Sequence, residues 1–213
     1  MLAEVILPKG TMEDIKIENA APEDAEAMAG LIYSSGPKAF DYVFGKQTPA
    51  AQDYLYHAVQ RNKGQYSHRN HVLVRSNGHV LGSMFNYDSR GLSAMYLPTV
   101  MSVLSFFRWR IWGVAKRSSV IDEVIKPPAD DMLVVAHLAV APEAQGMGIG
   151  SKLIDYAADI ARENGYAGLA LDVSMENPAA QRLYERLGFQ VCAERLSPVS
   201  EVPGHRYMEW RFS

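Results

Sequence analysis

A run of glycines between an apolar strand and an amphipathic helix is the feature that most constrains how this chain folds. Residues 132–140 are almost continuously apolar, and residues 148–163 place Ile149, Leu153 and Ala157 on one helical face. A second apolar run follows at residues 169–173. Two strands joined by a helix pair in parallel through a right-handed crossover, so the sequence predicts a βαβ unit.

The segments on either side of this unit predict antiparallel pairing. Asn77-Gly78 separates two apolar runs, and this dipeptide favours a tight hairpin because both residues tolerate positive φ. We expect strands at residues 14–18, 72–75, 80–87, 189–195 and 206–212, and helices at residues 22–33, 49–60 and 177–187. The expected fold class is α/β with a mixed, mostly antiparallel sheet, one central parallel βαβ unit and helices on both faces, in a single domain over residues 1–213.

A helical insertion is expected at about residues 88–128, where the pattern of short strands and helices stops. Residues 92–107 are uncharged and apolar, but the run is shorter than the roughly 20 residues that span a membrane. It also contains Pro98 and is followed by Arg108. We therefore predict a buried or substrate-facing helix and no membrane span. Whether its aromatic residues form a lid or an acceptor pocket, or only core packing or a dimer interface, stays open.

Composition excludes several classes of protein. The formal net charge of −3 argues against nucleic-acid binding, which needs a clear basic excess. With one cysteine, Cys192, an internal disulfide and a cysteine-based zinc cluster are ruled out, and the histidines lack metal-ligand spacing, so no metal is expected. Cys192 is interpreted as a small core residue. The first ten residues lack the pattern of a signal peptide, which favours the cytoplasm.

The glycine segment has the properties of an anion site. Glycine has no Cβ to keep a ligand away from the backbone, and the first N–H groups of a helix have no partner within the helix. Together with the helix dipole, they attract a group such as a diphosphate. The segment is Gln145-Gly146-Met147-Gly148-Ile149-Gly150-Ser151.

Three kinds of phosphate loop compete for this segment. A dinucleotide fingerprint needs G-x-G-x-x-G, and here the third glycine comes one position early. A Walker loop needs glycine directly before the lysine, and Ser151 stands before Lys152. The pattern Q/R-x-x-G-x-G/A is matched in full by Gln145, Gly148 and Gly150.

With that pattern, the chain resembles the GNAT superfamily of N-acetyltransferases. The likeness includes the preceding Leu138-Ala139-Val140-Ala141-Pro142 and a second block that is similar to N-x-x-A-x-x-L-Y-x-x-x-G-F, running from Asn177 to Phe189. The resemblance implies an acyltransferase that moves the acetyl group of acetyl-CoA to a primary amine by direct attack on the thioester. The alternative is a non-catalytic acyl-CoA-binding or sensor module on the same fold, acting as a monomer or homodimer in either case.

The resemblance also implies which residues hold acetyl-CoA. Its pantetheine arm would pair with the strand backbone near residues 138–140, much as an added strand does. The residues expected to contact it are Leu138, Ala139, Val140, Gln145, Gly146, Met147, Gly148, Ile149, Gly150, Ser151, Asn177, Ala180 and Tyr184. Asn177 has an equally simple explanation, because asparagine before proline is a favourable helix cap.

Two residues are expected to act in catalysis. Tyr184 matches the general-acid position of the resembled family, although at helical spacing it could also pack beside Leu183 and Leu187. His137 interrupts the apolar strand and could take the proton of the amine, or it could be a hydrogen-bonded core histidine.

Overall fold

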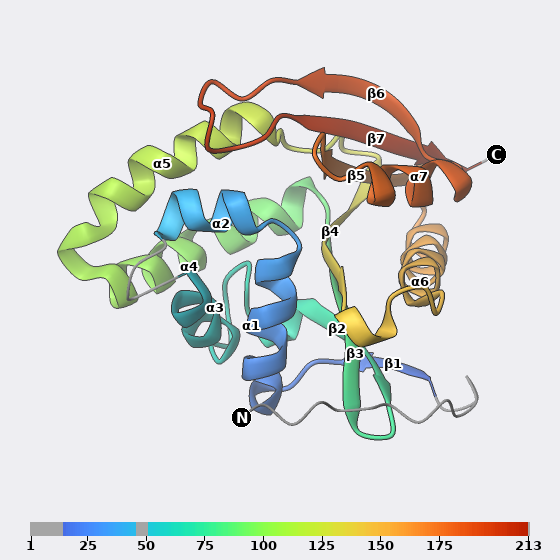
Figure 1. Cartoon of the computed structure of the whole chain (residues 1–213), viewed down its shortest axis with the longest axis horizontal. Helices are drawn as coiled ribbons and strands as arrows, with labels where there is room; N and C mark the ends of the chain where they lie inside the picture. The colour runs from blue at the N-terminus through green and yellow to red at the C-terminus, as the bar shows by residue number, and fades with distance from the viewer. Residues whose placement is uncertain (1–14, 46–50, 213) are drawn as a thin grey trace.

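The computed structural model describes residues 15–45 and 51–212 and contains one mixed sheet of seven strands (Figure 1). The order across the sheet is β1-β2-β3-β4-β5-β7-β6, and among these pairs only β4 and β5 are parallel. The strands are β1 (Lys16–Asn19), β2 (His71–Ser76), β3 (His79–Tyr87), β4 (Met132–Val140), β5 (Gly168–Ser174), β6 (Gln190–Arg195) and β7 (His205–Arg211).

Helices cover both faces of this sheet. One face carries α6 (Ile149–Glu163), and α1 (Ala25–Ser34) packs against the other face of β3 and β4 (Figure 1). The apolar face of α6 is fully enclosed, with Leu153, Ile154 and Ala157 at 0% exposure. The remaining helices are α2 (Pro37–Phe44), α3 (Ala51–Val59), α4 (Ser89–Phe107), α5 (Ile111–Val124) and α7 (Pro178–Arg186).

The central pair of strands separates soon after it forms. Met132, Leu133 and Val134 of β4 pair with β5, and the pairing ends there. β4 stays paired with β3 as far as Val140, although the register shifts where Met84 lies opposite both His137 and Leu138. His137 has φ 49°, as expected at a β-bulge, which bends the strand. One edge of β4 after residue 134 is therefore free of β5.

Most of the sequence-based elements are confirmed. Strand β4 has the predicted bounds, and the hairpin turns at Asn77 and Gly78, with φ of 49° and 80°. The fold class and the parallel βαβ unit are also confirmed. Parts of the predicted strand 14–18 and of the predicted helix 49–60, at residues 14 and 49–50, lie outside the described residues. The single domain stays a prediction.

Two expectations about burial are wrong. In α4 the buried residues are Ser102, Val103 and Phe107, so the alternative of a buried helix is wrong, and that of a substrate-facing helix stays a prediction. The insertion is two helices, α4 and α5, and within the described residues no helix is long and apolar enough to cross a membrane. Cys192 is exposed on the edge strand β6 and is not a core residue.

Gly168 offers a direct test of the β5–β7 pairing. A Cβ at this position would overlap the carbonyl oxygen of Trp210 and lie 2.9 Å from the Cα of Arg211. We expect Gly168→Ala to lower the free energy of unfolding by about 1–3 kcal/mol, as overpacking does. Urea denaturation measures this change.

The matched control is Gly30→Ala in α1, where an added Cβ meets nothing within 4 Å. Alanine is the better helix former, so this variant should be stabilised by about 0.5–1 kcal/mol. Equal effects of the two substitutions would contradict the close approach of β7 to β5.

Candidate active site

The glycine segment lies between the end of β4 and the start of α6, next to the point where β4 and β5 diverge. Gly146 and Gly148 have φ of 79° and 77°, a left-handed conformation in which glycine is strongly favoured. A Cβ at either position would meet nothing within 4 Å, so their need for glycine is conformational. Gly150 differs, because its Cβ would lie 3.1 Å from Cδ2 of Leu183 on α7, and that side chain would have to shift by a few tenths of an ångström.

The start of α6 presents unpaired donors. The helix begins at Ile149 with Gly148 as N-cap, and no side chain caps it. Among the described residues, the N–H groups of Gly148, Ile149, Gly150 and Ser151 have no hydrogen-bond partner. Residues 145–148 are exposed, whereas Ile149 and Gly150 are buried, so the part of the turn open to a ligand ends at Gly148. The turn thus has the donors and the accessibility of an anion site.

The end of β4 provides a second set of backbone groups. Ala139 and Val140 pair with Ser83 and Gly82 of β3, which uses one edge of the strand. The other edge, including that of Leu138, lies beyond the last pair with β5. An extended ligand could pair with this edge as an added strand.

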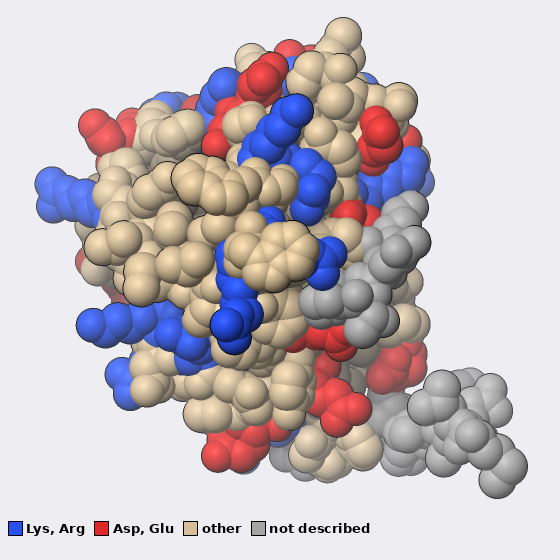
Figure 2. All heavy atoms as spheres, turned by 90° about the vertical axis from the view of Figure 1, so that its left-hand side faces the viewer, with Lys and Arg blue, Asp and Glu red and all other residues tan. Residues whose placement is uncertain are grey.

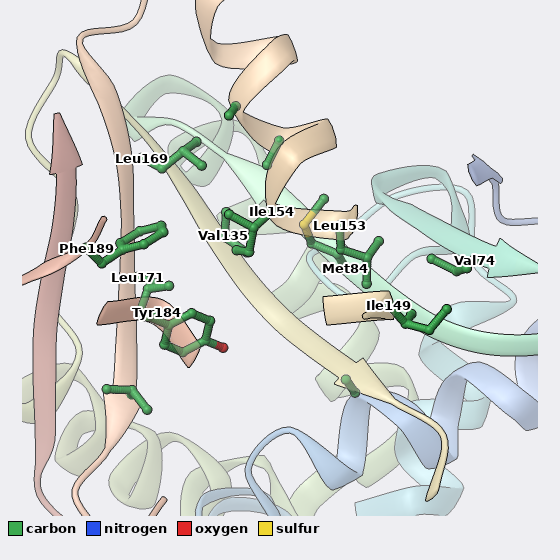
Figure 3. Close-up of a cluster of buried hydrophobic side chains, with 14 of the residues drawn as sticks. Val74, Met84, Val135, Ile149, Leu153, Ile154, Leu169, Leu171, Tyr184 and Phe189 are labelled. Atoms are coloured by element: carbon green, nitrogen blue, oxygen red, sulfur yellow. The ribbon is translucent and has the colours of Figure 1, made fainter. Parts of the chain in front are cut away.

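Tyr184 faces this edge from α7. Figure 3 shows its ring beside Leu171 and Phe189, with the hydroxyl end directed toward β4. The side chain is 8% exposed and its ring centroid lies 5.8 Å from that of Phe189. Burial raises the pKa of Tyr184 to about 12, so the phenol is protonated at neutral pH and remains a proton donor.

Asn177 has a structural task at the start of α7. Its Oδ1 accepts a hydrogen bond from the backbone N–H of Ala180 at 3.0 Å, and Pro178 occupies the first helical position. This is the predicted cap. It commits one side-chain oxygen of Asn177 and the N–H of Ala180, and leaves the amide NH₂ of Asn177 for another partner.

His137 projects from the bulge of β4 into a group of rings. Its ring lies 5.3 Å from Tyr66 and 6.1 Å from Phe40, between centroids, and its Nδ1 is 3.2 Å from Nε2 of His71. The Nδ1 of His71 is 3.0 Å from the carbonyl oxygen of Ser67 and must donate to it, so the Nε2 of a neutral His71 accepts from Nδ1–H of His137. This assignment leaves a lone pair on Nε2 of His137.

The two imidazoles are neutral over the physiological pH range. Burial and the nearby charge of a protonated His71 lower the pKa of His137 to about 3. Burial lowers the pKa of His71 to about 4, although the hydrogen bond to Ser67 opposes this shift. His137 is thus a hydrogen-bonded histidine at the edge of the core, and its ring packs against His71 of β2 and Phe85 of β3.

Known proteins share this sequence pattern and this fold. The sequence model of the Acetyltransferase (GNAT) family matches residues 39–189. The chain belongs to the Acetyltransferase (GNAT) family. The streptothricin acetyltransferase of Streptomyces lavendulae is 43% identical over 60 residues, which are 28% of this chain and 32% of that protein. The rat N-acetyltransferase 8B is 27% identical over 135 residues, 60% of this chain and 61% of the relative.

The fold is shared more widely than the sequence. A crystal structure of an N-acetyltransferase from Staphylococcus aureus Mu50 superposes with a TM-score of 0.69 at 17% identity, covering 91% of this chain and 99% of that chain. The chain spans about a third of the length of the first curated relatives it matches, 32% of the streptothricin enzyme.

One ionisable residue of this GNAT chain was missed by the sequence analysis. Asp172 interrupts the apolar run of β5 two residues beyond its last pair with β4. Its carboxylate is 10% exposed and accepts a hydrogen bond from Nη1 of Arg195 at 3.1 Å. Burial raises the pKa of Asp172 to about 7 despite that arginine. A carboxylate inside an apolar strand was the signal that could have identified it.

The surroundings of Asp172 are phenolic. Burial raises the pKa of Tyr87 to about 12, and the nearby charge of Asp172 adds to this shift. The guanidinium of Arg195 lies 5.1 Å from the centre of the Tyr207 ring.

Over residues 15–45 and 51–212, no three His, Cys, Asp or Glu side chains are grouped as metal ligands.

The pKa of Asp172 predicts a dependence of stability on pH. An unfolded aspartate has a pKa near 3.9, so between about pH 4 and 7 the folded chain holds this proton more tightly than the unfolded chain. The contribution of Asp172 to the free energy of unfolding then falls as pH rises, by at most ~1.4 kcal/mol per pH unit. Asp172→Asn should gain stability relative to the wild type across this window, as measured by urea denaturation at each pH.

The exposed carboxylate Glu194 provides the control, since Glu194→Gln removes an acid that is 56% exposed and paired with Arg206. The free energy of unfolding of Glu194→Gln, relative to that of the wild type, should not rise with pH over this window. The histidine contribution is common to all three proteins and cancels. A constant difference for Asp172→Asn would contradict the raised pKa.

Proposed function

We propose that this chain is an acetyl-CoA-dependent N-acetyltransferase that acetylates a primary amine by direct attack on the thioester. The observation that carries the proposal is the row of unpaired N–H groups at the start of α6, beside the free edge of β4. Membership of the GNAT family supports the same function. In this function the start of α6 binds the diphosphate of CoA, and the edge of β4 binds its pantetheine arm.

In this proposal the diphosphate of CoA binds the N–H groups of residues 148–151, and the exposed turn at Gln145, Gly146 and Met147 closes around it. Several backbone hydrogen bonds supply most of the affinity, since a helix dipole alone contributes about 0.3–1 kcal/mol. The pantetheine arm pairs with the free edge of β4 at residues 138–140. Asn177 contacts the arm through its amide NH₂, and Ala180 packs against it.

The reaction begins with a neutral amine. Its nitrogen attacks the thioester carbonyl carbon, a C–N bond forms, and the C–S bond breaks with its electron pair on sulfur. The free N–H groups of the β4 edge can donate to the oxygen as negative charge develops. Tyr184 donates its proton to the departing thiolate. The amine nitrogen gives up a proton as the C–N bond forms, and Tyr184 regains one from solvent.

Two groups are candidates for the proton of the amine. His137 has a free Nε2 lone pair, but a pKa of about 3 means that its protonated form is strongly disfavoured. Asp172 has a pKa of about 7, which lies closer to the value that suits a general base near neutral pH. We propose that His137 accepts a hydrogen bond that orients the amine, and that Asp172 is the stronger candidate for the acceptor of the proton.

Turnover across a panel of amines tests the function. Release of free CoA from acetyl-CoA should depend on the amine, and the panel should include small amines, amino acids, peptide N-termini, lysine side chains and amine-bearing antibiotics. Stabilisation by acetyl-CoA, but not by NAD or ATP, is expected in thermal unfolding, because a ligand at about 100 times its Kd contributes ~2.7 kcal/mol. Binding without CoA release over the panel would favour a non-catalytic module.

Ser151→Glu tests the anion site without disturbing the fold. The new carboxylate would occupy the positive end of α6, which stabilises a helix by about 0.3–1 kcal/mol but repels a diphosphate. We expect unchanged or higher thermal stability and a loss of acetyl-CoA affinity of at least about tenfold by calorimetry. Ser151→Gln has a similar size and no charge, so it should retain most of the affinity. Equal affinities for the two variants would place the diphosphate elsewhere.

Tyr184→Phe tests the proposed acid. The substitution keeps the ring in its packing with Phe189 and removes the proton donor, so turnover should fall by roughly 10²–10⁴-fold while acetyl-CoA binding persists. Tyr156→Phe, in the same core cluster on α6, is the control and should turn over normally. Unchanged turnover of Tyr184→Phe in a folded protein would remove this residue from the mechanism.

A further inference from the structure

The outer face of α4 and α5 exposes large apolar side chains that no other part of the described chain covers. Trp109 and Trp112, at the turn between the helices, are 81% and 82% exposed. The α4–α5 face is defined here by these tryptophans and by Tyr96, Leu97, Met101 and Leu104, which are 42–72% exposed. Exposed apolar patches of this kind, rimmed by polar residues, usually mark a binding surface.

The same segment is strongly basic. Residues 89–124 contain Arg90, Arg108, Arg110, Lys116 and Arg117 against two carboxylates, Asp122 and Glu123, whereas the whole chain has a net charge of −3. Figure 2 shows lysine and arginine side chains among uncharged residues on this side of the molecule, with acidic side chains mainly toward its margins. Arg108 and Arg110 flank Trp109 in the chain, so positive charge adjoins the exposed tryptophans.

A groove continues this surface toward α3. It has a volume of ≈ 600 Å³ and is lined by Leu97, Pro98 and Met101 of α4 together with Gln60, Arg61, Asn62 and Lys63. The lining residues from α4 are thus apolar, and the lining also includes the two cations Arg61 and Lys63. This arrangement suits a ligand with an apolar chain and an anionic head.

We propose that the α4–α5 face docks on the surface of an anionic lipid bilayer. Tryptophan favours the boundary between headgroups and acyl chains, because its ring is apolar and its N–H is polar. Lysine and arginine near this boundary are attracted by anionic headgroups. The two helices lie on the membrane in this arrangement and do not cross it, in keeping with the lengths and hydropathy of the described helices.

The charge pattern disfavours a second copy of the chain as the occupant. A symmetric dimer through this face would bring Arg108 and Arg110 toward their own copies, and the carboxylates of α5, Asp122 and Glu123, lie at the other end of that helix. Lipid phosphates supply the missing negative charge.

Docking in this orientation leaves the glycine turn accessible. The helices α4 and α5 lie at one end of the molecule and α6 at the other (Figure 1). The unpaired N–H groups of α6 would face away from the bilayer. The α4–α5 face contains none of the residues proposed to act in catalysis, so membrane binding can be measured separately from acyl transfer.

Co-sedimentation of the full chain with vesicles tests the proposal. We expect binding to vesicles of phosphatidylcholine with phosphatidylglycerol and little binding to phosphatidylcholine alone. Either Trp109→Ser with Trp112→Ser, or Arg108→Gln with Arg110→Gln, should lower the partition coefficient by more than about tenfold. Binding should also weaken as salt rises from about 0.1 M to 1 M, over which the screening length falls from about 10 to 3 Å.

The controls alter exposed residues away from this face. Val191→Ser removes an apolar side chain that is 41% exposed, and Arg186→Gln removes an exposed cation of α7, so both should bind vesicles like the wild type. Thermal unfolding checks that all variants fold. Brominated lipids should quench the fluorescence of Trp109 and Trp112, and the double tryptophan variant, which keeps Trp210, should lose this quenching.

Three results would overturn the proposal. The first is no binding of the wild type to vesicles that contain phosphatidylglycerol, and the second is equal binding to phosphatidylcholine alone. The third is a dimer in sedimentation velocity that the tryptophan substitutions dissociate while vesicle binding is absent, which would assign the face to a second copy. If the face bound acidic proteins and no lipid, the wild type would not bind vesicles that contain phosphatidylglycerol, which is the first of these results.

Discussion

The early separation of β4 from β5 is the constraint on which the rest of the site depends. Three residue pairs hold the strands together, and beyond Val134 no strand of the described residues pairs with β4 on that side. Unpaired strand edges are usually a liability, because they bind other strands. Here β4 has a bulge at His137, past its last pair with β5, and α7 brings Tyr184 to the exposed edge with its hydroxyl end toward β4 (Figure 3). The sheet thus keeps one edge open inside the molecule, where an extended ligand can complete it.

The glycines beside this edge solve different physical problems. Gly146 and Gly148 turn the chain through left-handed conformations, and Gly150 lets α6 approach Leu183 of α7. The first two shape a turn that exposes donors, while the third fixes the helix that carries those donors. A substitution at Gly150 would therefore affect packing before it affected any ligand. The motif combines a conformational and a packing requirement in one short segment.

The sequence predicted the elements whose signal is local. Strand β4, the Asn77-Gly78 hairpin and the caps of α7 depend on neighbours in the chain, and they are where the pattern places them. The helix α2 was missed although Gly36 and Pro37 mark its start, and its Phe40 packs beside His137. The burial of His137 and the raised pKa of Asp172 depend on distant segments, which no local pattern contains. The apolar run of α4 misled for a related reason, because apolarity predicts burial only where another element covers the residue.

The ionisation states around the divergence of β4 and β5 restrict the chemistry. Burial keeps His71 and His137 neutral and raises the pKa of Tyr184 and Tyr87, so these groups add no charge near neutral pH. Asp172, with its pKa of about 7, is there on the boundary between its neutral and charged forms. Surroundings of neutral rings disfavour any buried group that carries an unpaired charge. A carboxylate that changes charge near pH 7 can take up a proton there, and Arg195 at 3.1 Å moderates how tightly the proton is held.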